Sequence, residues 1–154
     1  MTDVDGKLLE LGLVWPVPPK PLAAYVPAVR SGNWLVVSGQ LPFRDGKLAA
    51  TGRVPSGINI EQAQAAAQQC VLNGLAVVRA ELGGDWSRLV RVVRIGAFVA
   101  SDDGFTEQAK VANGASELLL RLLGENGRHA RAAVGVNALP LGAAVEIEML
   151  VEVR

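Results

Sequence analysis

Residues 131–154 read RAAVGVNALPLGAAVEIEMLVEVR. One apolar run begins at Arg131, the pair Leu139-Pro140 predicts a turn, and a second apolar run follows it. The pattern predicts a β-hairpin with a permanent positive charge on one strand and the carboxylate of Glu146 on its neighbour. A soluble domain needs neither charge in so apolar a segment. We therefore expect this hairpin to bind an anion and to handle a proton or a water molecule.

The composition indicates one domain with a surplus of apolar residues. The 154 residues are 50% hydrophobic and 19% charged, with 15 basic and 15 acidic side chains. A chain of this size can bury a core of its own, and surplus apolar residues often lie in a subunit interface, so we expect an oligomer. The zero net charge argues against nucleic-acid binding, which depends on a concentrated positive field.

The cysteine count, the N-terminal residues and the short apolar runs favour a cytoplasmic location. Cys70 is the single cysteine, so it cannot form an intrachain disulfide and suits a reducing compartment. The acidic start at residues 1–5 does not look like a signal peptide, and no apolar run approaches the roughly 20 residues that span a bilayer. His129 is the single histidine, which excludes a multi-histidine metal site.

Periodicity and turn signals predict an α+β fold in a single domain over residues 1–154. A helix is expected at 4–13, followed by an extended arm to residue 22. The later elements are strands at 24–31, 34–38, 47–54 and 90–100, helices at 60–82 and 106–123, and the terminal hairpin. Asn59 is placed to cap the first long helix, and Gly124 to end the second. Two long helices against one mixed sheet make a two-layer sandwich.

Several short motifs occur in a fixed order between residues 23 and 154. They are Tyr25, Gly32-Asn33, Ser38-Gly39-Gln40-Leu41-Pro42, Asn113 with Glu117, Arg131 with Val134 and Val136, Leu139-Pro140, and Val145-Glu146-Ile147-Glu148. Their combination resembles the RidA family of reactive-intermediate deaminases, also called the YjgF family and formerly the L-PSP endoribonucleases. The resemblance implies a chorismate-mutase-like fold and a homotrimer with active sites between adjacent subunits. The reaction it implies is hydrolysis of enamine and imine carboxylates to 2-keto acids and ammonia, without cofactor or metal.

The resemblance assigns the two main chemical roles to Arg131 and Glu146. A guanidinium is permanently charged and matches a carboxylate in bidentate geometry, so Arg131 would clamp the carboxylate of a small substrate. Glu146 would hold the attacking water, which is general-base chemistry. The competing structural interpretations are an arginine at a strand end and a solvated glutamate on an alternating strand; Glu148 fits the latter.

Four further residues complete the implied site. Tyr25 would close over the substrate, Ser38 and Gly39 would offer hydroxyl and backbone groups at a strand end, and Asn113 would donate a hydrogen bond into the cleft. Each also has an ordinary explanation, as an interface aromatic, a strand terminus or a locally bonded helix residue. The partners of the hairpin thus lie about a hundred residues away in sequence, on the same chain or on another.

The chain departs from the family pattern at several points. Ala133 stands where the family commonly has a cysteine, His129 where it has a proline, and Pro27 where it often has a glutamine. The N-terminal extension is also longer than in the compact members of the family. We expect Arg131 still to bind the substrate carboxylate, in a cleft whose wall differs from that of other family members. A non-enzymatic carboxylate-binding trimer and an endoribonuclease remain open as alternatives, with chorismate mutase activity suggested only by fold analogy.

Overall fold

The computed structural model describes residues 3–18, 20 and 24–154. The end of the arm expected up to residue 22 therefore lies partly outside the described residues. In chain order the elements are α1 (Val4–Glu10), β1 (Ala28–Ser31), β2 (Trp34–Gln40), β3 (Phe43–Arg44), β4 (Lys47–Leu48), α2 (Ile60–Glu81), β5 (Leu89–Ala100), α3 (Gln108–Leu123), β6 (Ala130–Val136) and β7 (Val145–Val153). Short 3₁₀ turns lie at Trp86–Arg88, Gly124–Gly127 and Pro140–Gly142.

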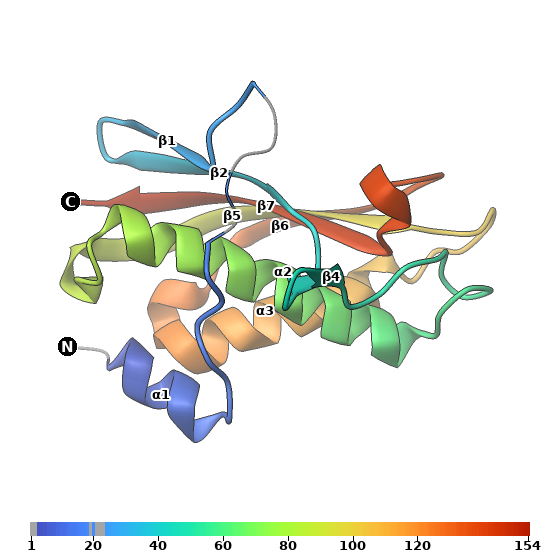
Figure 1. Cartoon of the computed structure of the whole chain (residues 1–154), viewed down its shortest axis with the longest axis horizontal. Helices are drawn as coiled ribbons and strands as arrows, with labels where there is room; N and C mark the ends of the chain where they lie inside the picture. The colour runs from blue at the N-terminus through green and yellow to red at the C-terminus, as the bar shows by residue number, and fades with distance from the viewer. Residues whose placement is uncertain (1–2, 19, 21–23) are drawn as a thin grey trace.

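A five-stranded mixed sheet forms one layer of the molecule, in the order β1-β2-β7-β5-β6. Only β5 and β6 pair in parallel, and the other neighbours are antiparallel. Helices α2 and α3 lie side by side under one face of the sheet, and α1 lies beyond them (Figure 1). The predicted α+β class, with a mixed sheet against two long helices, is confirmed.

The predicted terminal hairpin is wrong, because β6 and β7 do not pair with each other. Strand β5 lies between them and pairs with both. Helix α3 carries the chain back from the end of β5 so that β6 enters parallel to it, as a helical crossover does. The turn expected at Leu139-Pro140 exists, but residues 137–144 pass across the end of β5 rather than joining adjacent strands.

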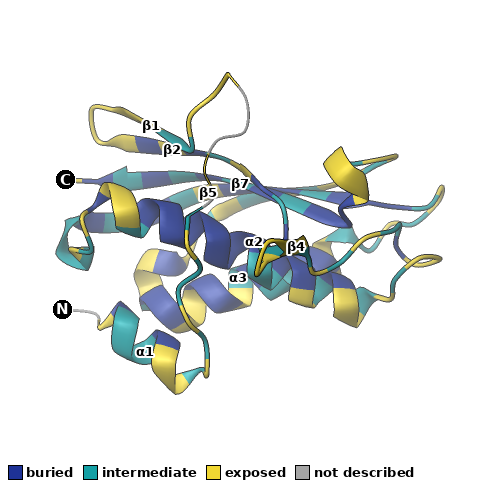
Figure 2. Cartoon of the chain, in the orientation of Figure 1, coloured by how far each residue is buried: buried dark blue, intermediate teal, exposed yellow. Residues whose placement is uncertain are grey.

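The long helix α2 begins at its expected cap. The side chain of Asn59 accepts a hydrogen bond from the backbone N–H of Gln62, and the Gln62 side chain accepts one from the N–H of Asn59. This reciprocal pair satisfies backbone donors that a helix start leaves free. Small residues let α3 approach α2 closely: a Cβ added at Gly114 would overlap the backbone carbonyl of Gln64. Figure 2 shows the buried residues of both helices turned toward the sheet.

Two predicted strands differ from the observed ones in length. The strand expected at 24–31 begins only at Ala28, because Pro27 has no N–H to donate to a ladder. The strand expected at 47–54 shrinks to Lys47–Leu48, which pairs with β3 in a separate two-stranded ribbon. The rest of the expected strand, residues 49–54, makes isolated β-bridges instead, such as that between Thr51 and Ala143.

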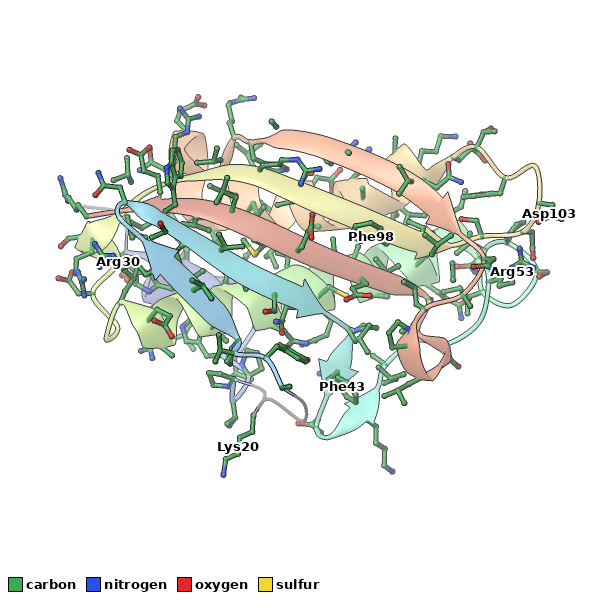
Figure 3. The ribbon with its side chains drawn as sticks, turned by 90° about the horizontal axis from the view of Figure 1, so that it is seen from above. Lys20, Arg30, Phe43, Arg53, Phe98 and Asp103 are labelled. Carbon is green, nitrogen blue, oxygen red and sulfur yellow. The ribbon has the colours of Figure 1, made fainter. Side chains whose placement is uncertain are left out.

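The second face of the sheet carries no helix (Figures 1 and 3). Apolar side chains lie on it side by side: Val29 pairs with Val36 and Val36 with Leu150, while Val134 pairs with Phe98. Val29, Val36 and Val134 are each about half exposed. An apolar sheet face in a folded domain is typical of a surface that packs against another molecule. We call it the open sheet face.

Among the helices that the structure describes, none is both long enough and apolar enough to cross a bilayer.

Candidate functional site

Arg131 on β6 extends its guanidinium along the surface of α3. Its Nη1 donates to Oδ1 of Asn113 at 2.9 Å and to Oγ of Ser116 at 3.0 Å, and its Nη2 donates to the carbonyl of Ala109 at 3.3 Å. A guanidinium has five N–H groups. Two therefore remain without a partner among the described residues, one of them on Nε. An arginine that is held in place and keeps two N–H groups free can bind an anion.

The spacing of α3 explains how these partners meet the arginine. Asn113 and Ser116 are three residues apart, so they lie on the same helix face, one turn above the other. Asn113 accepts from Arg131 through its side-chain oxygen, which leaves its amide N–H groups available to donate. Its expected role as a donor into the cleft stays a prediction.

A cavity of about 240 Å³ opens beside the guanidinium. Its lining is Ser116, Leu120, Gly127, Arg128, His129 and Arg131. Arg128 already pairs with Glu125, at 2.9 and 3.0 Å from Nε to the two carboxylate oxygens. Arg131 is therefore the arginine of this cavity whose charge has no carboxylate partner among the described residues.

His129 and Ser116 form a hydrogen-bonded pair that sequence reasoning did not find. Nδ1 of His129 lies 2.6 Å from the carbonyl of Gly127, and Nε2 lies 2.9 Å from Oγ of Ser116. A carbonyl only accepts, so Nδ1 carries the proton and Nε2 accepts from the serine hydroxyl. Burial lowers the pKa of His129, and the charge of Arg131 lowers it further against the opposing effect of the Gly127 carbonyl. The ring is thus neutral at pH 7.

Glu146 on β7 lies directly over Gly39 on β2. A Cβ added at Gly39 would overlap Oε1 of the glutamate, so only glycine leaves room for this side chain. The register also shifts here: Val37 faces Met149 and Gln40 faces Ile147, which leaves Ser38 and Gly39 opposite a single residue of β7. This is a β-bulge, a feature that re-aims side chains and is common beside active sites.

The carboxyl group of Glu146 has a raised pKa. It is half-buried, and burial together with the nearby charge of Glu148 raises its pKa above the ordinary value. Glu148 itself lies 3.1 Å from Nη1 of Arg94 in an ion pair whose two side chains are both about half exposed. A carboxylate with a raised pKa is a better proton acceptor than an ordinary glutamate.

Two hydrogen bonds from Ser38 anchor the segment that follows Tyr25. The Ser38 hydroxyl donates to the carbonyl of Val26 at 2.7 Å, and the Ser38 N–H donates to the carbonyl of Pro27 at 2.9 Å. These bonds hold Val26 and Pro27 against the bulge, while the Tyr25 side chain is 55% exposed. The role of Tyr25 in covering a ligand stays a prediction.

The structure separates the predicted residues into two groups on opposite faces of the sheet. Arg131 pairs with Ile95 of β5, whereas Glu146 pairs with Phe98, three positions further along. Because side chains alternate along a strand, an odd offset places the two on different faces. Ile95 is fully buried toward the helices, and Phe98 lies on the open sheet face (Figure 3).

We name these groups the arginine half-site (Arg131, Asn113 and Ser116) and the glutamate half-site (Glu146, Ser38 and Gly39). Within one chain they cannot close on the same small molecule, because the sheet lies between them.

Cys70 takes no part in either half-site. Its side chain is fully buried on α2, and burial, reinforced by the charge of Glu146, raises the pKa of its thiol well above the ordinary value. It therefore behaves as a small apolar residue. Across the described ranges, no three His, Cys, Asp or Glu side chains gather closely enough to hold a metal ion.

The sequence and the fold of this chain agree with one family of known proteins. The family model for endoribonuclease L-PSP matches residues 16–153. The chain belongs to the endoribonuclease L-PSP family, the YjgF/RidA family. The family resemblance of the motifs is thereby confirmed.

Two individual proteins match nearly the whole chain. Protein TCP17 of Trypanosoma cruzi is 47% identical over 152 residues, which cover 98% of this chain and 94% of that protein. Atu1372 of Agrobacterium tumefaciens, a crystal structure of unknown function, is 50% identical with a TM-score of 0.93, covering 98% of this chain and 92% of the other.

The YjgF protein of E. coli is a more distant member of the same family. It is 25% identical with a TM-score of 0.64, over 90% of this chain and 94% of its own. The much higher score of the Agrobacterium protein shows that the present chain shares its architecture almost from end to end. This includes the N-terminal segment that precedes the family match.

Proposed function

We propose that this L-PSP family member hydrolyses small 2-imino and 2-enamine carboxylates to 2-keto acids and ammonia. The observation that carries the proposal is the pair of half-sites: a fixed arginine with two free N–H groups on one face, and a half-buried glutamate with a raised pKa on the other. Carboxylate clamping and water activation are the two functions that this hydrolysis requires.

The proposal includes a homotrimer, in which the arginine half-site of one subunit meets the glutamate half-site of the next. Two properties of the chain support an assembly. The half-sites are separated by the sheet within one subunit, and the open sheet face exposes valines side by side. In the proposed trimer, the β6–α3 edge of one subunit packs against the open sheet face of the next. This packing would remove apolar surface from water and place unlike half-sites against one another.

In the proposed reaction, the free N–H groups of Arg131 bind the substrate carboxylate and orient the imine carbon. Glu146 accepts a proton from water as the water oxygen forms a bond to that carbon. The imine nitrogen takes that proton from Glu146 as the C=N double bond becomes single, which gives a carbinolamine. Glu146 then accepts the hydroxyl proton and passes it to nitrogen, so the C–N bond breaks and ammonia leaves as the C=O bond forms. Water and imine are thus converted to a 2-keto acid and ammonia, and Glu146 ends ionised.

A trapping assay tests this proposal. An amino-acid oxidase generates 2-imino acids, semicarbazide traps those that persist, and the protein is added in catalytic amount. Wild type should lower semicarbazone formation and Arg131→Ala should not, while the neighbouring Arg128→Ala serves as a matched control. The proposal fails if no imine tested is affected, or if Arg131→Ala equals wild type. Carboxylate binding without turnover would instead support a binding module.

A further inference from the structure

The Ser116–His129 pair has a geometry that imine hydrolysis does not use. Two groups contact the Ser116 hydroxyl: Nε2 of His129 accepts its proton, and Nη1 of Arg131 donates to its oxygen. The Gly127 carbonyl accepts from Nδ1 and so fixes the tautomer of the imidazole. The pair lies on the wall of the 240 Å³ cavity, half-buried and reachable from it.

We propose that Ser116 is a nucleophile, with His129 as its general base, and that this cavity hydrolyses small carboxylic esters. A serine hydroxyl is a weak nucleophile until a neighbouring base removes its proton. Here the base nitrogen is 2.9 Å from Oγ, within the distance that proton transfer requires.

The orientation of the imidazole supports the role of base. In serine hydrolases a third group holds the ring in the tautomer that leaves its other nitrogen free to accept. The Gly127 carbonyl, 2.6 Å from Nδ1, holds His129 in this tautomer. The pKa of His129 is lowered, first by burial, so the ring stays neutral and able to accept a proton at pH 7.

Arg131 supplies the electrostatic part of the site. Its Nη1 donates to Oγ of Ser116, which stabilises negative charge as the proton leaves, and its two uncommitted N–H groups can bind the oxyanion of the tetrahedral intermediate. Leu120 provides an apolar wall for the acyl group.

The steps balance without a cofactor. Oγ attacks the ester carbonyl carbon while its proton passes to Nε2 of His129; the ester C–O bond then breaks, and the leaving alcohol takes that proton. Water next gives a proton to Nε2 and attacks the acyl carbon. The serine oxygen recovers the proton as it leaves, and a carboxylic acid is released.

Covalent labelling tests the nucleophile directly. A fluorophosphonate probe and 4-nitrophenyl acetate are incubated separately with the full-length protein, and the modified peptide is identified by mass spectrometry. Wild type and the control Ser31→Ala, altered at the far edge of the sheet, should carry the label on Ser116 and release 4-nitrophenolate with a burst. Ser116→Ala should lose both, and Ser116→Cys should regain acylation.

The base is tested by His129→Gln. Loss of a general base predicts acylation slower by roughly 10²- to 10⁴-fold. Wild-type acylation should also fall as the pH drops through the lowered pKa of His129, and this pH dependence should be absent in the variant. A 2-keto acid should inhibit the reaction, because it competes for the N–H groups of Arg131.

Three results would overturn the proposal: an unlabelled Ser116 peptide, turnover in Ser116→Ala equal to wild type, or acylation in His129→Gln at the wild-type rate. The imine-trapping assay is independent of all three. Ester hydrolysis and imine hydrolysis can therefore fail separately.

Discussion

Arg131 and Glu146 are carried by the two strands that flank β5, and they project from opposite faces of the same sheet. The first is bonded to α3 and the second covers a bulge in β2. A site that needs both must draw them from two subunits. Loss of assembly should thus remove activity without disturbing either residue.

Arg131→Ala should weaken binding of a small carboxylate such as 2-oxobutanoate by at least about 100-fold. The reason is the loss of two hydrogen bonds to a charged group, worth roughly 1.5–3 kcal/mol each. Arg131→Lys should give an intermediate value, because it keeps the charge but loses the planar fork. Isothermal titration calorimetry measures the affinities. Equal affinity in wild type and Arg131→Ala would show that the carboxylate binds elsewhere.

Gly39→Ala should lower the rate of imine hydrolysis by roughly 10²-fold, the usual effect of displacing a catalytic group by about 1 Å. The added Cβ overlaps the flexible end of Glu146, so the carboxyl must move while the fold persists. Gly96→Ala is the matched control, because its Cβ displaces Glu148 in the same way. Steady-state kinetics, with circular dichroism as a folding check, measures the effect. Similar losses in both variants would argue against a specific role for Glu146.

Glu146 should make the stability of the protein depend on pH. Its folded-state pKa is raised by burial and by Glu148, so between the ordinary pKa and the raised one the native state binds more protons than the unfolded state. Stability therefore falls as the pH rises through that window. Glu146→Gln should remove this loss and melt higher than wild type above the window, with the difference disappearing below it. Thermal denaturation from pH 3.5 to 8 follows the effect; a Tm difference that does not change with pH would contradict it.

The same carboxyl group should also make the rate of catalysis depend on pH, and this rate should rise with pH where stability falls. Only the ionised form of Glu146 can accept a proton from water, so the rate of imine hydrolysis should fall as the pH drops through its raised pKa. A pH–rate profile without that acidic limb would remove Glu146 from the role of base.

Val36→Lys should convert the proposed trimer to smaller species. Val36 is 49% exposed on the open sheet face, beside Val29 and Leu150, and a charge buried there would lack a partner. Leu9→Lys is the matched control, since Leu9 is 68% exposed on α1, away from this face. Multi-angle light scattering reports the mass. A wild-type monomer, or a trimer unaffected by Val36→Lys, would place the interface elsewhere or remove it.

Local elements of this protein could be predicted because they depend on residues close together in the chain. The start of α2 follows from Asn59 and Gln62, whose reciprocal caps need only one turn of helix. The alternation along β7 puts Ile147 in the core and Glu146 away from it. Arg131, Glu146 and the Ser38-Gly39 pair lie in short motifs that resemble those of the RidA family, and the roles that this resemblance implies stay predictions.

The arrangement of those elements could not be predicted in this way. The apolar runs around Leu139-Pro140 have the pattern of a hairpin, yet β5 separates them, because strand order depends on the α3 crossover and on contacts between residues far apart in sequence. The Ser116–His129 pair likewise joins a helix to the entrance of a strand and has no sequence motif.

By itself, the sequence determined the α+β class, the element types and the chemical groups available, since these follow from periodicity, capping and side-chain identity over a few residues. Only the tertiary structure decided which groups meet. Strand pairing put Arg131 and Glu146 on opposite faces, and the packing of α3 on β6 joined Arg131 to Ser116 and, through it, to His129. The physical reason is that a register offset or a helix crossing is set by the whole core, not by any short segment of the chain.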